Sequence, residues 1–238
     1  MGKAILIGGE KGGTGKSTVA TNLSIMLAIM GHDPIVLDCD KQGSSLKFIS
    51  HRNDKNIKPT PPCVQVVGKF LNSEIEDLAS RYEMVVIDAG GRDSVELRAA
   101  MASPSVTHIY SPLQPSEFDL ETLSTMDELV YLSRAYNQNL NAYILLNLCP
   151  THSKITTTKE AGDLAKTFDN LNICNTTIGH RIAFQYASSQ AKSVVEFESD
   201  KISLLPDYQA KNYSHKATDE MIHFYKEAFN EDFNSLIT

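Results

Sequence analysis

Short, continuously apolar runs alternate along the chain with longer segments in which apolar residues recur at helical spacing. Such runs between turn residues are typical of buried strands, whereas i, i+3, i+4 spacing indicates amphipathic helices. The pattern predicts strands at residues 3–8 (KAILIG), 33–40 (DPIVLDCD), 63–68 (CVQVVG), 84–91 (MVVIDAGG), 107–112 (THIYSP) and 141–148 (NAYILLNL). It predicts helices at residues 16–31, 72–83, 118–136, 154–168 and 214–233, the first of them closed by Gly31.

This rhythm of strand and helix predicts the fold class. The runs AYILLNL and MVVID are too continuously apolar for strands with one face in water, so we expect both of their faces to be buried. We therefore predict an α/β protein with a mostly parallel, twisted sheet and helices on both faces. The C-terminal third is less regular, and residues 53–62 are polar and rich in proline. No repeat or linker-like composition interrupts the chain, so residues 1–238 are predicted to form a single domain.

Charge and composition narrow the class of partner. The net charge of -7 and the pI of about 5.5 argue against an overall basic nucleic-acid binder, although a local basic face stays open. The four cysteines lack CxxC spacing and are predicted to be reduced, small buried side chains. The sequence shows no signal peptide, and no apolar run reaches the roughly 20 residues of a membrane span. We therefore expect a cytoplasmic protein.

The segment GGEKGGTGKST, residues 8–18, carries the strongest chemical signal. It follows an apolar strand and opens a helix, which is the context of a phosphate-binding loop. Backbone N–H groups from Gly12 to Ser17 can surround an oxyanion, and the helix beginning near Lys16 directs its positive end at the phosphates. Lys16 is predicted to reach the β- and γ-phosphates, and the Ser17 hydroxyl to bind Mg²⁺. A further lysine, Lys11, lies inside the loop.

Three carboxylates lie at predicted strand ends. Asp38 and Asp40 close the segment VLDCD, and Asp88 closes VVID. Because ligands in parallel α/β sheets bind at the carboxyl ends of the strands, these side chains are expected to face the phosphate site. Asp88 is predicted to hold Mg²⁺ through water, and Gly90 and Gly91 to respond to the γ-phosphate.

With these residues in place, the sequence resembles the ParA/MinD family of deviant Walker A ATPases, in particular small ParA-type plasmid partition proteins. The resemblance lies in KGGTGKST, DCDKQGSS, VVIDAGG, ILLNLCP and SSQAKSVVEF and extends over nearly the whole chain. It implies a P-loop NTPase fold, Mg²⁺-dependent hydrolysis of ATP to ADP and phosphate, and an ATP-sandwich homodimer. Lys11 matches the lysine that contacts the other subunit's phosphates. Two triphosphates face to face repel each other unless cations lie between them.

The resemblance also assigns roles to individual residues. It makes Lys11, Lys16 and Asp40 the catalytic residues, with Asp40 orienting the attacking water, and it implies an adenine contact for Asn147. The predicted nucleotide-binding residues are Gly12, Gly13, Thr14, Gly15, Lys16, Ser17, Thr18 and Asn147, and the predicted metal site comprises Ser17, Asp88 and Asp38. Three features depart from the family pattern: Lys41 replaces a frequent proline, Glu10 replaces Asn, Gln or Pro, and DAGGRDS replaces a DTPP-like switch.

Within the family, the tail at residues 214–238 favours a ParA type over a MinD type. Its polar positions are largely acidic, whereas a membrane-surface helix needs lysine and arginine there, so we expect no membrane binding. The tail is instead predicted to pack Met221, Ile222, Phe224, Tyr225 and Phe229 on the domain. The scattered cysteines argue against an iron-sulfur electron carrier. We also expect a small ParA type without a helix-turn-helix region before its P-loop.

The ParA resemblance implies nonspecific DNA and a ParB-like DNA-binding adaptor as partners, with nucleoid association in the ATP-bound state. Candidate DNA-binding cations lie dispersed in the C-terminal third: Arg181, Lys192, Lys201 and Lys211, with Lys154, Lys159, Lys166 and Lys216 as further surface lysines. Scattered lysines often serve only solvation, so a second hypothesis stays open. In it, the protein is an ATP-switched positioning or adaptor protein, MinD-like or related to carboxysomes or conjugation, that acts through protein partners.

Overall fold

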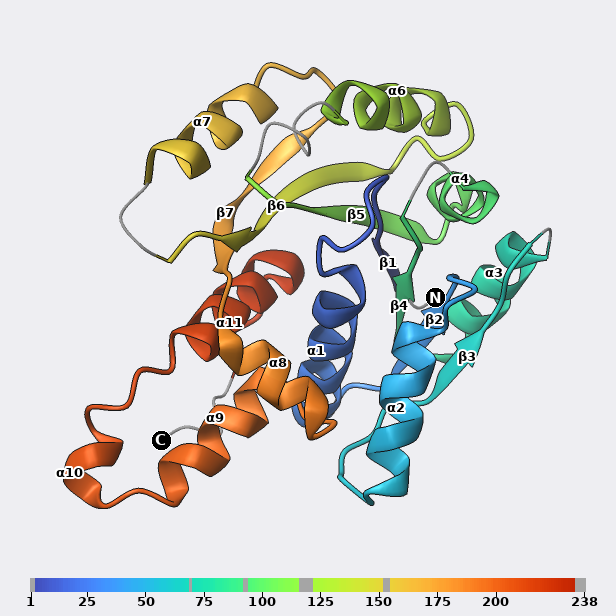
Figure 1. Cartoon of the computed structure of the whole chain (residues 1–238). Coiled ribbons are helices and arrows are strands. Elements are labelled where there is room, and N and C mark those ends of the chain that lie inside the picture. The colour runs from blue at the N-terminus through green and yellow to red at the C-terminus, as the bar shows by residue number, and fades with distance from the viewer. Residues whose placement is uncertain (1–2, 69, 92–93, 116–121, 152–154, 234–238) are drawn as a thin grey trace.

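The computed structural model describes residues 3–68, 70–91, 94–115, 122–151 and 155–233, with the side chains of residues 155–158 excepted. One seven-stranded sheet, in which all neighbouring strands run parallel, forms its centre in the order β3-β2-β4-β1-β5-β6-β7 (Figure 1). The strands are β1 Lys3–Ile7, β2 Pro34–Asp38, β3 Cys63–Gln65, β4 Met84–Asp88, β5 Val106–Leu113, β6 Asn141–Cys149 and β7 Asn172–Gly179. The predicted fold class is confirmed.

Helices cover both faces of this sheet (Figure 1). Their bounds are α1 Lys16–Ile29, α2 Ser44–Asp54, α3 Leu71–Arg81, α4 Val95–Ala102, α6 Leu123–Ser133, α7 Ile155–Ala165, α8 Ile182–Ser189, α9 Val194–Ser203, α10 Asp207–Ala210 and α11 Lys216–Phe229. The predicted helices therefore exist, although part of the segment 118–136 lies outside the described residues. The pattern did not predict β7, α2, α4, α8, α9 or α10.

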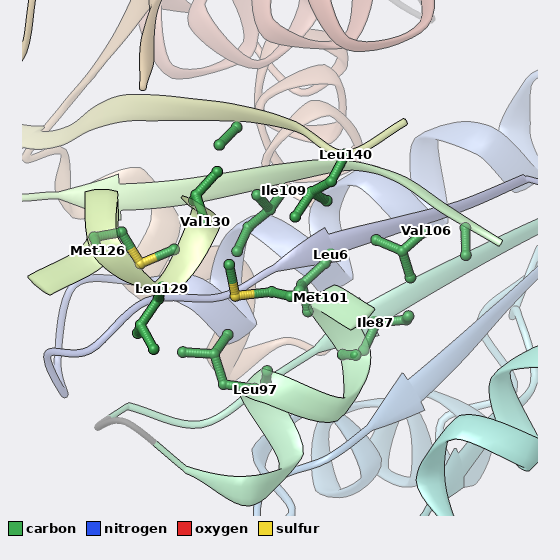
Figure 2. Close-up of a cluster of buried hydrophobic side chains, with 14 of the residues drawn as sticks. Leu6, Ile87, Leu97, Met101, Val106, Ile109, Met126, Leu129, Val130 and Leu140 are labelled. Carbon is green, nitrogen blue, oxygen red and sulfur yellow. The ribbon is translucent and has the colours of Figure 1, made fainter. Parts of the chain in front are cut away.

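Alternation along the strands divides the apolar core into two clusters. In β1, Ala4 and Leu6 join the cluster under α3, α4, α6 and α7, whereas Ile5 and Ile7 join the one under α1, α9 and α11. Figure 2 shows the first cluster, to which Leu6 and Ile109 of the strands and Leu97 of α4 belong. Because both faces of each central strand are buried, the strands read as continuous apolar runs.

The C-terminal helix α11 belongs to the second cluster. Met221, Phe224 and Tyr225 are fully buried on it, and the Phe224 ring meets Tyr110 of β5 edge-on at 5.2 Å between ring centroids. The predicted packing of this helix on the domain is confirmed, so its apolar face is used internally. In the part of the chain described, no helix is long and apolar enough to cross a membrane.

Candidate functional site

The loop between β1 and α1 has the backbone geometry of a phosphate cradle. Gly13 and Gly15 have φ angles of 81° and 88°, a left-handed conformation that only glycine adopts without strain. Gly15 is also needed for space, because a methyl group there would lie 2.4 Å from the Asn147 amide nitrogen. The open surroundings of Gly12 and Gly13, with no atom within 4 Å of an added methyl, leave room for an anion.

The two lysines of this loop are linked in the structure. Lys16 is 7% exposed, and its Nζ donates a hydrogen bond of 2.5 Å to the Lys11 carbonyl oxygen. The Lys16 ammonium is thus held against the loop at the start of α1, where it can turn to a phosphate. Lys11 is half-buried.

Asp38 and Asp88 end neighbouring strands and lie directly opposite each other in the β2–β4 pairing. Asp38 is fully buried, and its two oxygens each accept a backbone N–H, from Asp40 and from Leu46, at 3.0 Å. Burial raises the pKa of Asp38, and these bonds oppose the rise. Asp38 therefore shapes the loop that carries Asp40 and the first turn of α2. The metal-ligand role predicted for Asp38 stays a prediction.

Asp88 is 1% exposed and accepts a hydrogen bond of 2.6 Å from the Ser45 hydroxyl. Burial raises its pKa to about 6, although hydrogen bonds from Ser45 and Ser17 lower it, and the charge of Asp38 adds to the rise. Sequence reasoning missed Ser45, because nothing in its local pattern distinguishes it from a helix-start serine. Asp88 thus lies between the P-loop helix and α2.

Asp40 contacts the loop after β4. Its Oδ1 accepts the Gln42 N–H at 2.9 Å, and a methyl group added to Gly90 would lie 2.7 Å from Oδ2. The next glycine, Gly91, lies against the P-loop itself, since a methyl group there would lie 2.7 Å from the Gly12 nitrogen. The P-loop and the two acidic loops therefore meet at one point, at the carboxyl ends of the central strands.

These loops surround a cleft of about 1130 Å³. Its lining combines P-loop backbone, Lys16, the start of α1, the loops after β2 and β4, and the α8–α9 turn. The lining residues are Gly12, Gly13, Gly15, Lys16, Ser17, Thr18, Thr21, Asn22, Cys39, Asp40, Lys41, Gln42, Ser44, Phe48, Gly90, Gly91, Ser94, Glu96, Ser188 and Lys192. A phosphate-bearing ligand fits this donor set.

Comparison with known proteins identifies the family. Residues 5–216 match the model of the CobQ/CobB/MinD/ParA nucleotide binding domain, which is most of the chain. The chain belongs to this family.

The chain is also similar to individual proteins, in sequence or in fold. The chain is 26% identical over 159 residues to the sporulation initiation inhibitor protein Soj of Bacillus subtilis, a match that spans 66% of this chain and about half (53%) of Soj. The fold of this chain is similar to that of a Borrelia burgdorferi B31 protein assigned to plasmid partition and bound to AMPPNP (TM-score 0.63, 18% identity, 83% of this chain and 96% of that one). It is also similar to the septum site-determining protein MinD of Pyrococcus horikoshii with Mg-ADP (TM-score 0.64, 18% identity, 96% of both chains).

The family is one of nucleotide binding domains, and the nucleotides held by the two neighbours, AMPPNP and Mg-ADP, make ATP and Mg²⁺ the groups to compare with this site. Its residues fit both groups: the glycine cradle and Lys16 suit a triphosphate, and the Ser17 hydroxyl and Asp88 carboxylate are oxygen donors of the kind Mg²⁺ prefers. Among the described residues, no group of three or more His, Cys, Asp or Glu could hold a metal. In sites where Mg²⁺ binds with a nucleotide, phosphate oxygens and water commonly supply most of its ligands.

Asn147 of β6 lies behind the P-loop. It is 4% exposed, and its amide donates a hydrogen bond of 2.7 Å to the Thr14 carbonyl oxygen. In this arrangement Asn147 supports the loop backbone, and its predicted adenine contact stays a prediction. Thr18 lines the cleft, as its predicted nucleotide-binding role requires.

Most of the four predicted DNA-binding cations have partners within the chain. Arg181 forms a two-bond pair with Glu220 (2.5 and 2.8 Å), which raises its pKa. Lys192 pairs with Asp200, and Lys201 lies 5.6 Å from the centre of the Phe197 ring. Lys211 is exposed. The structure therefore does not bring these four together as one set of unengaged cations.

Sequence analysis also missed the buried Arg52, which anchors the C-terminal end of α2. Arg52 is fully buried and donates to both carboxylate oxygens of Glu196 (2.5 and 2.9 Å) and to the carbonyl oxygens of Pro59 and Ala191. These bonds fasten α2 to the α8–α9 turn, which lines the same cleft through Lys192. Removing one partner of such a buried pair is strongly destabilising.

Proposed function

We propose that this ATPase is a DNA partition ATPase, of the kind that segregates plasmids. In the proposal, residues 1–238 act as one ATPase domain, ATP joins two copies into a sandwich dimer, and the dimer binds nonspecific DNA on the nucleoid. A ParB-like DNA-binding adaptor stimulates hydrolysis. The observation that carries the proposal is the second lysine of the P-loop, Lys11, next to a cradle that already has Lys16 as its own cation.

The charge balance supports a dimer. Lys16 is held within its own loop, so it serves the nucleotide of its own subunit. Lys11 then supplies a cation to the phosphates of the other subunit, and this lowers the repulsion between two facing triphosphates. Asp40 orients the attacking water, and Ser17 and Asp88 hold Mg²⁺. These assignments are part of the same proposal.

Replacing Lys11 tests the dimer. Lys11→Ala should still bind ATP, because Lys16 and the backbone cradle remain, but it should stay monomeric with ATP and hydrolyse it slowly. Sedimentation and turnover of Lys11→Ala are compared with those of Lys58→Ala, an exposed lysine beyond α2. A Lys11→Ala protein that dimerises and turns over like Lys58→Ala would contradict the proposed cross-subunit role.

Binding of unrelated duplex DNA tests the partition function. The ATP form should bind DNA more tightly than the ADP form and lose it as salt rises, because binding to phosphates releases counterions. DNA retention that ignores both nucleotide and salt would contradict this function.

A second candidate is an ATP-switched positioning or adaptor protein that acts through protein partners. The observation that favours it is the pairing of Arg181 with Glu220 and of Lys192 with Asp200, in a chain of net charge -7. Ion-paired cations contribute less to DNA affinity than unpaired ones. Absence of DNA binding at low salt, together with an ATP-dependent dimer, would favour this candidate.

A further inference from the structure

The hydroxyl of Ser45 joins the helix α2 to the carboxylate of Asp88. Ser45 is fully buried in the first turn of α2, and its Oγ donates to Asp88 Oδ2 at 2.6 Å. Asp88 also accepts a hydrogen bond from Ser17, the first-turn serine of α1. One buried carboxylate therefore receives hydroxyls from two helices that begin at the cleft.

The Ser45 bond restricts how the carboxylate can turn. With Oδ2 held by Ser45, the plane of the Asp88 carboxylate is set by α2 rather than by β4 alone. The backbone connection between these segments is separate, since the Cys39 N–H donates to the Asp88 carbonyl oxygen at 2.8 Å. Loss of the hydroxyl would thus free the Asp88 side chain and leave the strands joined.

The position of Ser45 in the chain connects this bond to Asp40. Asp40 and Ser45 are separated by the turn around Gly43, whose N–H donates to the Asp40 carbonyl oxygen at 3.0 Å. Asp38 accepts the N–H groups of Asp40 and Leu46, which lie at the two ends of this segment. The segment from Asp40 to Leu46 is therefore braced at both ends, and Ser45 is the member whose side chain reaches Asp88.

We propose that Ser45 is a positioning residue of the ATPase: its hydroxyl orients the Asp88 carboxylate toward the Mg²⁺ site and couples that site to the loop bearing Asp40. The inference rests on the proposed role of Asp88 as the acid that holds Mg²⁺. Its basis is the juxtaposition of the buried Ser45 hydroxyl, the buried Asp88 carboxylate and the Ser17 hydroxyl at the edge of the cleft.

The test measures how much Mg²⁺ tightens the binding of a fluorescent ATP analogue. Ser45→Ala should bind the analogue as the wild type does in EDTA, but should require about tenfold more Mg²⁺ for half-maximal tightening, since a hydrogen bond to a charged group is lost. Ser50→Ala, an exposed serine on the same helix, is the matched control and should keep the wild-type Mg²⁺ requirement. Ser45→Thr, which keeps the hydroxyl, should restore it in part.

A double variant separates positioning from simple stabilisation. If Ser45 acts through Asp88, Ser45→Ala should add no further change in Mg²⁺ requirement to Asp88→Asn. A Ser45→Ala protein that melts at a lower temperature but keeps the wild-type Mg²⁺ requirement would overturn the inference. If Asp88→Asn in the same experiment needs more Mg²⁺ than the wild type, the role of Asp88 still stands. If Asp88→Asn itself keeps the wild-type Mg²⁺ requirement, both assignments fail.

Discussion

The two ends of the central sheet hold their charged groups in opposite ways. At the carboxyl ends of β2 and β4, Asp38 and Asp88 are buried side by side, and burial raises the pKa of each. At the amino ends, His32 lies between Glu83 (2.8 Å) and Glu231 (2.9 Å), and the hydrogen bond from His32 lowers the pKa of Glu83. The two carboxylates at the carboxyl end repel each other, whereas the histidine at the amino end places a positive charge between two negative ones.

This difference indicates which end of the central sheet binds a ligand. A buried carboxylate pair with raised pKa values costs free energy unless a cation arrives, whereas a histidine between two carboxylates is already compensated. The amino end also borders a cavity, of about 510 Å³ and lined by Lys3, His32, Glu83, His108 and Phe229 among others. A cavity by itself therefore does not mark the catalytic end, whereas the P-loop glycines and Lys16, which line only the larger of these two cavities, do.

The largest effect is expected from Lys16→Ala at the carboxyl end. Loss of the buried ammonium that faces the phosphates should weaken ATP binding by at least about 100-fold. Lys3→Ala, which removes an exposed lysine at the amino end, is the matched control and should leave binding unchanged. Titration with a fluorescent ATP analogue measures both, and equal affinities for the two variants would remove the distinction between the ends.

Asp40→Ala should slow turnover by about 100-fold or more while ATP affinity holds or rises. The attacking water loses its orienting base, and the γ-phosphate loses a nearby negative charge. The variant should therefore accumulate as an ATP-bound dimer in sedimentation. A purely structural Asp40, which holds its loop through the Gln42 N–H, predicts a lower melting temperature together with weaker ATP binding. That combination would rule out the catalytic assignment.

Gly90→Ala is a finer probe of the same contact. Its methyl group would displace the Asp40 carboxylate from a separation of 2.7 Å. Because the displaced atom is the end of a side chain, stability should change little. Turnover should fall by about tenfold, since small misplacements at a reacting centre are costly.

The control for this probe is Gly31→Ala, which has open space but a φ of 88°. It should cost about 1–2 kcal/mol of stability with turnover intact. Steady-state kinetics and thermal melting of both variants check the contrast. Normal turnover in Gly90→Ala would mean that the observed position of Asp40 is not the one used in catalysis.

The smallest effect belongs to the amino end. Burial lowers the pKa of His32, but the hydrogen bonds to Glu83 and Glu231 outweigh it and raise the pKa above 6.5. The charged form thus favours the folded state. This stabilisation is complete below about pH 6.5 and is lost as pH rises through the folded-state pKa.

His32→Gln should therefore lower the melting temperature more at about pH 6 than at about pH 9. The difference should be about 1 kcal/mol or less for this partly exposed cluster, or about 2–4 °C. Thermal melting at the two pH values measures it, and ATP turnover is the control, since it should be unaffected. A melting difference that is larger at the higher pH would contradict the assigned charge of His32.

Local sequence was sufficient for the parts of the protein that depend on neighbours along the chain. The apolar runs of β1, β2 and β4 and the periodicity of α1 follow from period-two and period-3.6 patterns. The P-loop is local as well, because its glycines, Lys16 and Ser17 are consecutive. Asp88 at a strand end could be expected near the phosphates, since parallel strands share one carboxyl edge.

The remaining features depended on segments far apart in sequence. Ser45 reaches Asp88 across 43 residues, and Arg52 reaches Glu196 across 144, so no window of sequence contains both partners. The same holds for Arg181, a plausible surface cation by sequence, which the fold pairs with Glu220. Strand order and helix packing decide which polar groups form hydrogen bonds with one another. A buried charge is stable only when it is paired, and the fold determines which partners lie within reach.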